Sequence, residues 1–279
     1  MVETDYGIKS FRIKKGVKTH EMEGHTESIL KIMVIDPNKM EKITKEAIPD
    51  DPKVITCSFD NTILLWDFEK MEVITKMTCP SQSELSALTF LYNCCLVATG
   101  HEDGAIRLWN MEINSSVLLK CHESKKHMNT ISCIHGTIYK EVEFLICGSY
   151  DGRISVWEIS EKKSSSGGAS MNSTIYPQMR HVIDNVEEEE EPGDFEILVL
   201  NFCEIEVDGQ VEGYILAGGN NRKIVAFSIR TGLKFNSLEG HEDSVTCMAI
   251  DGQLLITGAD DCSIRLWNLK TFSSIGILG

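Results

Sequence analysis

Short apolar runs with alternating polar positions recur along the chain, separated by clusters of turn residues. Alternation over about four to eight residues is typical of a β-strand that is buried on one face. Five of these runs, which we predict to be inner strands, are Leu30–Ile35, Leu85–Phe90, Ile131–Ile134, Ile197–Phe202 and Val245–Ile250. A second apolar run follows the inner strand, as Leu254–Thr257 follows Val245–Ile250.

A tight turn and two further strands complete each predicted unit. The turn has an Asp-Gly or Asp-Asn character, which suits a hairpin because these residues tolerate positive φ. The third strand ends at an aromatic residue. A fourth run follows, as in Val73–Met77 and Leu233–Leu238. The pattern therefore predicts an all-β chain built from four-stranded units.

The four tryptophans mark an internal repeat. Each has an Asp six residues before it and an Ile three residues before it, and is followed by Asp, Asn or Glu. Two weaker copies place Phe where the others have Trp. A repeat of about 40 to 45 residues with this signature indicates propeller blades of four strands. The six anchors near which we expect blades to end are Phe11, Trp66, Trp109, Trp157, Phe227 and Trp267.

This repeat resembles the WD-repeat family of β-propellers over nearly the whole chain. Gly24-His25 and Gly240-His241 match the Gly-His dipeptide of that family. The resemblance implies that a His, a Ser or Thr, an Asp and a Trp form a hydrogen-bonded chain inside a blade. Such a relay is physically sound, because a buried indole N–H and a buried carboxylate both need partners. We expect these polar residues to stiffen the blades.

Carried over by position, the hydrogen-bonded sets differ between blades. Two complete sets are His25, Thr56, Asp60 and Trp66, and His241, Thr257, Asp261 and Trp267. The second blade has Thr99, Asp103 and Trp109 without an obvious His. The third has His122, Asp151 and Trp157, with Cys147 where a hydroxyl is expected. The blade ending near Phe227 has Ala217 and Asn221, so we expect no such chain there.

The predicted architecture is one WD-repeat propeller region over residues 1–279. It has five full blades and an N-terminal outer half-blade, because the first motif leaves no room for two inner strands before it. Since a ring of this family usually has about seven blades, we expect the chain to be part of a larger ring, completed by further sequence or by another chain.

Two irregular segments interrupt the repeat. Residues 36–52 are charged and contain three prolines, which predicts a loop between the first two strands of their blade. Residues 161–194 hold a Ser/Gly tract and the five glutamates 187–191, and we expect a flexible insert there. Its role is either that of a solvated spacer or that of an acidic docking arm for a basic partner.

Charge and composition exclude several functional classes. The net charge of −15 disfavours nucleic acid as a partner. We expect no membrane contact, since the sequence shows neither a signal peptide nor an apolar run long enough to span. The ten cysteines include no C-x-x-C pair, so we expect buried thiols in an intracellular, cytoplasmic protein and no metal. Neither a G-x-S-x-G elbow nor a phosphate-binding loop is present, so we expect no catalytic residue, no cofactor and no small-molecule substrate.

The residue before each repeat Asp is expected to point to one rim of the blades, where a binding loop would carry specificity. These candidates are Phe59, Glu102, Tyr150 and Asp260. Glu27 and Asp243 follow the Gly-His positions and add acidity to the same rim. Aromatic side chains in turns either anchor an interface or pack on neighbouring loops. The pattern indicates other proteins as partners, with a basic face.

The function that we predict is a non-catalytic interaction scaffold. The charged inserts and incomplete blades also resemble the large WD-repeat proteins of cilia and flagella, which suggests a ciliary or axonemal assembly. An alternative is a transient adaptor that reads a short peptide on the rim, and a remote alternative is an enzyme. A role as a ubiquitin-ligase substrate receptor is disfavoured, because none of the tryptophans is followed by the W-D-x-R motif.

Overall fold

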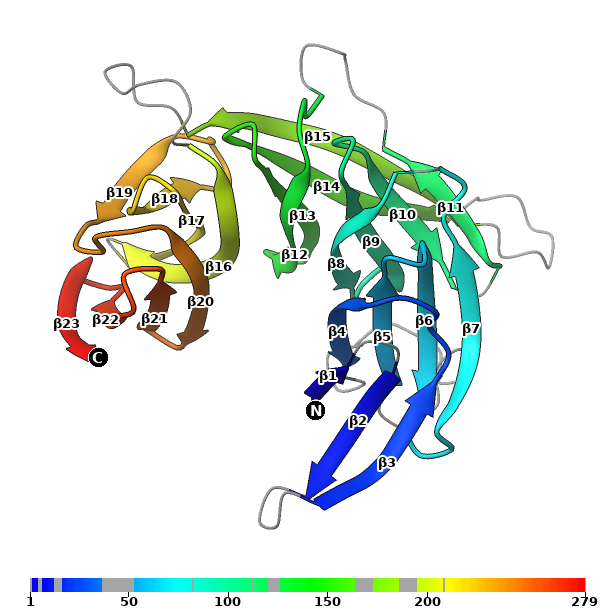
Figure 1. Ribbon diagram of the computed structural model, residues 1–279. Helices are drawn as coiled ribbons and strands as arrows, with labels where there is room; N and C mark the ends of the chain where they lie inside the picture. The colour runs from blue at the N-terminus through cyan, green and yellow to red at the C-terminus, as the bar shows by residue number, and fades with distance from the viewer. Residues whose placement is uncertain are drawn as a thin grey trace. The chain divides into compact units, whose positions relative to one another are not determined.

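The computed structural model describes most of the chain, and every regular element in the described part is a β-strand. No helix in that part is long and apolar enough to cross a membrane. The described residues are 2–4, 7–12, 17–36, 53–81, 83–111, 113–119, 126–163, 173–185, 195–207 and 209–278. They form two compact units, residues 1–119 and 120–279 (Figure 1).

The first unit contains a three-stranded sheet and two four-stranded blades. Antiparallel neighbours follow one another along the chain in each. The N-terminal sheet consists of β1 (Val2–Thr4), β2 (Gly7–Arg12) and β3 (Val17–Glu23). The first blade consists of β4 (Ile29–Ile35), β5 (Lys53–Ser58), β6 (Thr62–Asp67) and β7 (Glu72–Thr78). The second consists of β8 (Leu85–Leu91), β9 (Leu96–His101), β10 (Ile106–Asn110) and β11 (Ser115–Leu118).

The second unit contains three four-stranded blades, again with neighbours in chain order. The third blade consists of β12 (Ile131–Tyr139), β13 (Val142–Ser149), β14 (Arg153–Lys163) and β15 (Ser173–Asp184). The fourth consists of β16 (Ile197–Val207), β17 (Gln210–Gly219), β18 (Ile224–Ser228) and β19 (Lys234–Leu238). The fifth consists of β20 (Val245–Asp251), β21 (Leu254–Ala259), β22 (Ile264–Asn268) and β23 (Ser273–Leu278).

The predicted all-β class and the five full blades are confirmed, and two details are corrected. The N-terminal half-blade has a third strand, because β1 pairs with β2 through Val2–Thr4. The flexible insert is shorter than 161–194, since β14 continues to Lys163 and Ser173–Asp184 forms β15. This stretch forms a strand because it lies opposite the long β14 and completes the blade. Residues 164–172 and 186–194, and the predicted loop after Asp36, lie outside the described residues.

The turn between the second and third strands has the same backbone conformation in all five blades. One residue of each turn has positive φ, as the Asp-Gly and Asp-Asn patterns predicted. Three of these residues, Asn61, Arg222 and Cys262, are not glycine and adopt φ of 60°, 63° and 62°. The five positions are Asn61, Gly104, Gly152, Arg222 and Cys262. The repeat therefore extends to the weak fourth blade.

Within each unit, neighbouring sheets pack face to face through apolar side chains. Three of the tryptophans pack against the sheet that precedes their own in the chain. Trp66 packs with Met22 of β3. Trp109 packs with Ile63 and Leu65 of the first blade. Trp267 packs with side chains of the fourth blade, including Leu216 and Ala226. These three tryptophans thus fill the space between neighbouring sheets of one unit, which explains why they share one repeat position.

A β-bulge distorts the fourth strand where it passes the aromatic anchor. In the first, third, fourth and fifth blades the pairing register shifts beside the Trp or Phe. An extra residue therefore stands in the fourth strand without a partner directly opposite it. In the fourth blade this residue is Phe235, since Ala226 pairs with Asn236 and Phe227 with Lys234.

Candidate functional site

The first blade contains the complete hydrogen-bonded set that the resemblance implied. Trp66 Nε1 donates to Thr56 Oγ1 at 2.8 Å, and His25 Nε2 lies 2.7 Å from the same oxygen. His25 Nδ1 lies 3.0 Å from Asp60 Oδ2. Because Thr56 accepts from the indole, its own proton is free to go to Nε2, which leaves the proton on Nδ1 to face Asp60. The chain of donors thus runs in one direction from the indole to the carboxylate.

The fifth blade repeats this arrangement at almost the same distances. Trp267 Nε1 donates to Thr257 Oγ1 at 2.8 Å, and His241 Nε2 lies 2.7 Å from that oxygen. His241 Nδ1 lies 2.9 Å from Asp261 Oδ2. Asp261 also accepts from the backbone N–H of Glu242 at 2.9 Å. This carboxylate therefore ties the segment before the first strand to the turn after the second.

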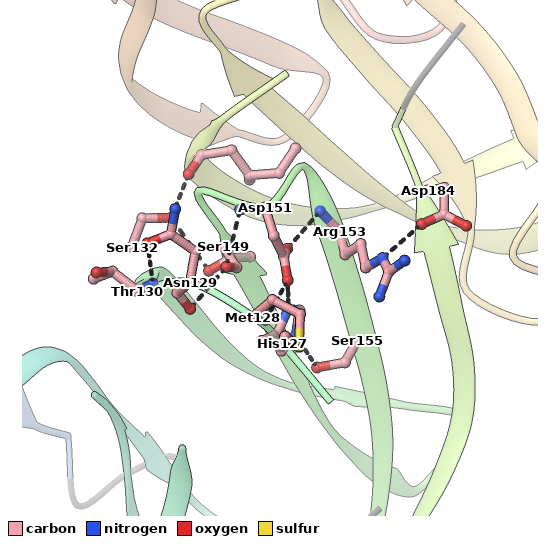
Figure 2. A network of polar contacts seen from close by, with 12 residues as sticks. His127, Met128, Asn129, Thr130, Ser132, Ser149, Asp151, Arg153, Ser155 and Asp184 are labelled. Carbon is pink, nitrogen blue, oxygen red and sulfur yellow. Dashed lines mark hydrogen bonds and ion pairs between the residues drawn. The ribbon is translucent and has the colours of Figure 1, made fainter. Parts of the chain in front are cut away.

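The third blade has the same network with two substitutions, which corrects the prediction. His127 lies 3.2 Å from Asp151, in the place where the sequence suggested His122; His122 itself lies outside the described residues. The hydroxyl comes from Ser155, whose Oγ lies 2.9 Å from His127 Nε2 and accepts from Trp157 Nε1 at 3.1 Å. Figure 2 shows His127 between Asp151 and Ser155.

The serine replaces the missing hydroxyl because of strand register. Ser155 of β14 pairs directly with Cys147 of β13, the position at which the first and fifth blades have Thr56 and Thr257. Directly opposite residues share one face of an antiparallel sheet. A signal for His127 was present in the sequence, since a hydroxyl residue and a β-branched residue follow it three and four positions later, as they do after His25 and His241.

The second blade uses a histidine that the sequence analysis missed. His101 is the last residue of β9, and its Nε2 lies 3.1 Å from Thr99 Oγ1, which accepts from Trp109 Nε1 at 2.8 Å. The other ring nitrogen, Nδ1, lies 3.4 Å from the carbonyl oxygen of Ser83. Asp103 does not contact this ring in any described bond. It accepts instead from the N–H of Ala105 at 3.0 Å and shapes the turn.

The fourth blade has no such relay, as expected, because Ala217 and Phe227 carry no polar side-chain atom. Its turn is closed differently: Asn220 Nδ2 donates to Glu196 Oε2 at 2.8 Å. Asn220 lies at the position equivalent to Phe59, and Glu196 at the position equivalent to Ser28, since the N–H of Asn220 donates to the carbonyl of Glu196 as that of Phe59 does to Ser28. They were not singled out in the sequence because this blade lacks the Trp anchor.

Burial and hydrogen bonding fix the protonation of these networks. Burial lowers the pKa of His25 and of His101, so both rings stay neutral near neutral pH. Burial alone would raise the pKa of Asp60, but hydrogen bonds from Thr62, Thr26 and His25 lower it below its ordinary value. Asp151 and Asp261 behave in the same way. The carboxylates are therefore ionised acceptors.

The Ser155–His127–Asp151 set has the residue types of a hydrolytic triad but not its accessibility. Ser155 is fully buried, and its oxygen accepts the indole N–H of Trp157. A nucleophile must reach a substrate carbon, which this oxygen does not. Within the described residues, no group of three or more His, Cys, Asp or Glu side chains comes together to hold a metal ion. The geometry indicates that Ser155, His127 and Asp151 stabilise the blade through hydrogen bonds.

The rim candidates lie where two segments of each blade meet. The backbone N–H of the residue before each repeat Asp donates to a carbonyl just before the first strand: Phe59 to Ser28 and Glu102 to Glu84 in the first unit. In the second unit, Tyr150 donates to Thr130 and Asp260 to Ser244, each at 3.1 Å or less. This bond recurs because the second-to-third turn and the segment that precedes the first strand share one edge of the sheet.

The candidate side chains at this edge are exposed. Phe59 is 44% exposed and Tyr150 is 39% exposed. Glu27, Glu102, Asp243 and Asp260 are exposed as well. Glu27, Phe59 and Glu102 belong to the first unit, and Tyr150, Asp243 and Asp260 to the second. Met128, which no sequence pattern marked, is 78% exposed at this edge, and its N–H donates to Asp151 at 2.9 Å (Figure 2).

In the first, third and fifth blades, the network carboxylate lies between two rim residues: the one before it in sequence and the one whose N–H it accepts. These pairs are Phe59 with Thr26, Tyr150 with Met128, and Asp260 with Glu242. The third blade presents an apolar pair and the fifth an acidic pair. The buried sets therefore hold a rim whose chemistry changes from blade to blade.

Comparison with known proteins assigns the family. The WD domain, G-beta repeat profile matches residues 16–67, 71–110, 117–158 and 232–268. Striatin-3 of Mus musculus is 24% identical over 80% of this chain and 33% of its own length. The ribosome biogenesis protein WDR12 homolog of Ixodes scapularis is 24% identical over 58% of the chain and 37% of its own length. Apoptotic protease-activating factor 1 of Danio rerio is 22% identical over 79% of the chain and 18% of its own length.

The chain spans about a third of the length of the striatin-3 proteins that it matches. The similarity to these WD-repeat proteins supports a role in protein interaction. The four profile matches cover more than half of the chain, on the blades whose tryptophans and histidine networks are described above. The chain belongs to the WD-repeat family.

Proposed function

We propose that the chain is a non-catalytic protein-interaction scaffold whose turn rim holds partner proteins. The observation that carries this proposal is the pair of exposed residues that each network carboxylate positions on the rim. Aromatic and methionine side chains such as Tyr150 and Met128 are favoured as interface anchors. Their backbone is tied to a buried relay, so little conformational entropy remains to be lost when a partner binds.

The preferred partner has a basic face. In the fifth blade, Glu242, Asp243 and Asp260 are all exposed at the same edge. Complementary charge speeds encounter and selects partners more than it adds affinity. Partner capture at this blade is therefore expected to weaken as the salt concentration rises.

The test is quantitative copurification with the full chain carrying Asp243→Lys and Asp260→Lys. The matched control is Asp251→Lys, an exposed aspartate at the far end of β20, which is the opposite edge of the same blade. We expect the double rim variant to lose specific partners while the control retains them. Retention of the same partners by all variants would contradict the proposal.

A parallel test addresses the apolar pair. Tyr150→Ser with Met128→Ser removes both exposed anchors of the third blade. Tyr176→Ser is the control, because Tyr176 is 46% exposed on β15 of that blade but is not a rim residue. Loss of partners in the rim variant alone is the expected result.

A transient adaptor is the second candidate function, favoured by the small size of each anchor pair. Copurification of a partner at fixed stoichiometry would support the scaffold. Exchange of a short peptide with micromolar affinity at the same rim would support the adaptor.

We further propose that the scaffold works inside the cell, in the cytoplasm, in a ciliary or axonemal assembly. The intracellular part is supported by the described cysteines, which are not joined in disulfides, as is usual in reducing compartments. The ciliary part rests on the charged inserts and incomplete blades of the sequence. Affinity purification from ciliated and non-ciliated cells tests it, and identical partner sets from both would contradict it.

A further inference from the structure

The fourth blade carries a groove that runs from the β18–β19 turn, at the end remote from its rim turn, to Asn221 and Lys223 beside the rim turn. One hollow of about 520 Å³ is lined by side chains of β17, of the β18–β19 turn and of β19. A second of about 320 Å³ lies between β15 and β18–β19. Leu233 and Lys234 line both hollows. We call the combined surface the β18–β19 groove; all of it belongs to the second unit.

The apolar part of the groove consists of two exposed side chains, Phe235 and Leu233, and the ring of Phe235 packs on two other aromatic rings. Phe235 is the bulge residue of β19, and its ring lies 4.4 Å from the buried ring of Tyr214 and 5.5 Å from Phe272. Phe235 nevertheless stays 43% exposed, and Leu233 is 69% exposed. A ring held by two others loses little freedom on binding, which makes Phe235 a ready anchor point.

The groove is lined by three cations, Arg230, Lys234 and Lys223, and by two carboxylates, Glu212 and Asp184. Asp184 is paired with Arg153 at 3.0 Å. Glu212 lies 3.9 Å from Arg230 Nε and 3.9 Å from Nζ of Lys140, which lies beside the groove. Arg230 is 68% exposed. The groove therefore has a small excess of positive charge, in a chain whose net charge is −15.

We propose that the β18–β19 groove is a second docking site, and that it binds an acidic peptide with an apolar anchor residue. The carboxylates of the peptide pair with Arg230 and Lys234, and its anchor side chain packs between Leu233 and Phe235. The volumes suit a few side chains of an extended segment, as in other ligand sites of about 300 to 1,000 Å³. The charge of this ligand is opposite to that of the basic partner proposed for the rim.

The test is fluorescence anisotropy of the full chain with a fluorescein-labelled, amidated peptide of sequence Glu-Glu-Leu-Phe-Glu-Glu. We expect saturable binding that weakens with salt. Arg230→Glu with Lys234→Glu should weaken it at least about tenfold, as should Leu233→Ser with Phe235→Ser. The matched controls are Lys31→Glu and Ile113→Ser, exposed residues of the first unit, which should leave binding unchanged.

Two further variants separate binding from folding and from the rim. Arg230→Lys with Lys234→Arg keeps both charges and should retain binding. Tyr150→Ser with Met128→Ser should retain it too, so a failure of the rim proposal and a failure of this one are distinguishable. Four results would overturn the inference: no saturable binding at millimolar peptide, full binding by the charge-reversed groove, equal loss in the Lys31→Glu control, or tighter binding of a phosphoserine peptide that lacks carboxylates.

Discussion

A single hydroxyl oxygen is the centre of each polar network, because it serves the indole and the imidazole at once. Thr56 Oγ1 lies 2.8 Å from Trp66 Nε1 and 2.7 Å from His25 Nε2, and all three residues are buried. Removing such an oxygen leaves two buried polar groups without a partner, which costs more than the bond itself contributes.

Thr56→Val should therefore lower the free energy of unfolding by about 2 kcal/mol, within the range of about 1 to 3 kcal/mol for an unsatisfied buried group. Valine keeps the shape of threonine and removes only the hydroxyl. Urea unfolding measures the change, and Thr56→Ser, which retains the oxygen, is the control. Equal stability of Thr56→Val and the unmodified chain would show that the relay does not stabilise the blade.

Buried histidines also make stability depend on pH. Burial lowers the pKa of His135 in β12 to about 4 from an ordinary value of 6.5. Between these values the unfolded chain binds a proton that the folded chain does not, so stability is full above about pH 6.5 and declines as the pH falls towards 4. His25 and His101 act in the same direction.

His135→Gln should flatten the dependence of the melting temperature on pH between 6.5 and 4. The carboxylates Asp60, Asp151 and Asp261 have lowered pKa values and so lose their contribution only below about pH 4. Their effect is therefore separable from that of the histidine. An unchanged slope in the variant would assign the pH dependence to other groups.

At the scale of the element, strand register decides which side chain completes a network. Cys147 stands where the first and fifth blades have threonine, and Ser155 reaches the same place from the neighbouring strand. Ser155→Ala should lower the unfolding free energy by about 1 to 3 kcal/mol. Adding Cys147→Thr should recover most of that loss, and a double variant no more stable than Ser155→Ala would refute this exchange of roles.

The faces of the blades differ in how well they are covered. The Ile three residues before the anchor is at most 4% exposed in the first four blades but is 47% exposed at Ile264 of the fifth. Ile154→Ala should cost about 2 to 5 kcal/mol, as buried truncations do, while Ile264→Ala should cost less than about 1.5 kcal/mol. Chemical unfolding of both variants compares them, and equal losses would mean that Ile264 is covered in solution.

The blades could be predicted well from the sequence, because the Trp, Asp and Ile positions recur once in each four-stranded unit. The site was predicted less completely, for reasons of geometry. His101 approaches its blade's relay from the end of a strand rather than from the preceding segment, so no repeat position marks it. Ser155 becomes visible only through its register with Cys147. Met128 is a rim residue because Asp151 accepts its N–H, which a sequence pattern does not show.

At the scale of the molecule, the chain is acidic overall but its surfaces differ in sign. In the second unit, the fifth blade presents Glu242, Asp243 and Asp260 at its rim, whereas the cations that line the β18–β19 groove are Arg230, Lys223 and Lys234. Opposite charges at separate places allow two partners to be held at once. This arrangement suits a scaffold and is the basis of both docking proposals.

In the proposed scaffold, the buried networks provide stability and the rim provides binding. The decisive experiment measures unfolding free energy and partner capture on the same two variants, Thr257→Val and Tyr150→Ser with Met128→Ser. We expect Thr257→Val to lose about 1 to 3 kcal/mol of stability but to keep its partners at a temperature where it stays folded. The rim variant should keep its stability and lose its partners. Loss of partners by folded Thr257→Val, or unchanged capture by the rim variant, would contradict this division of roles.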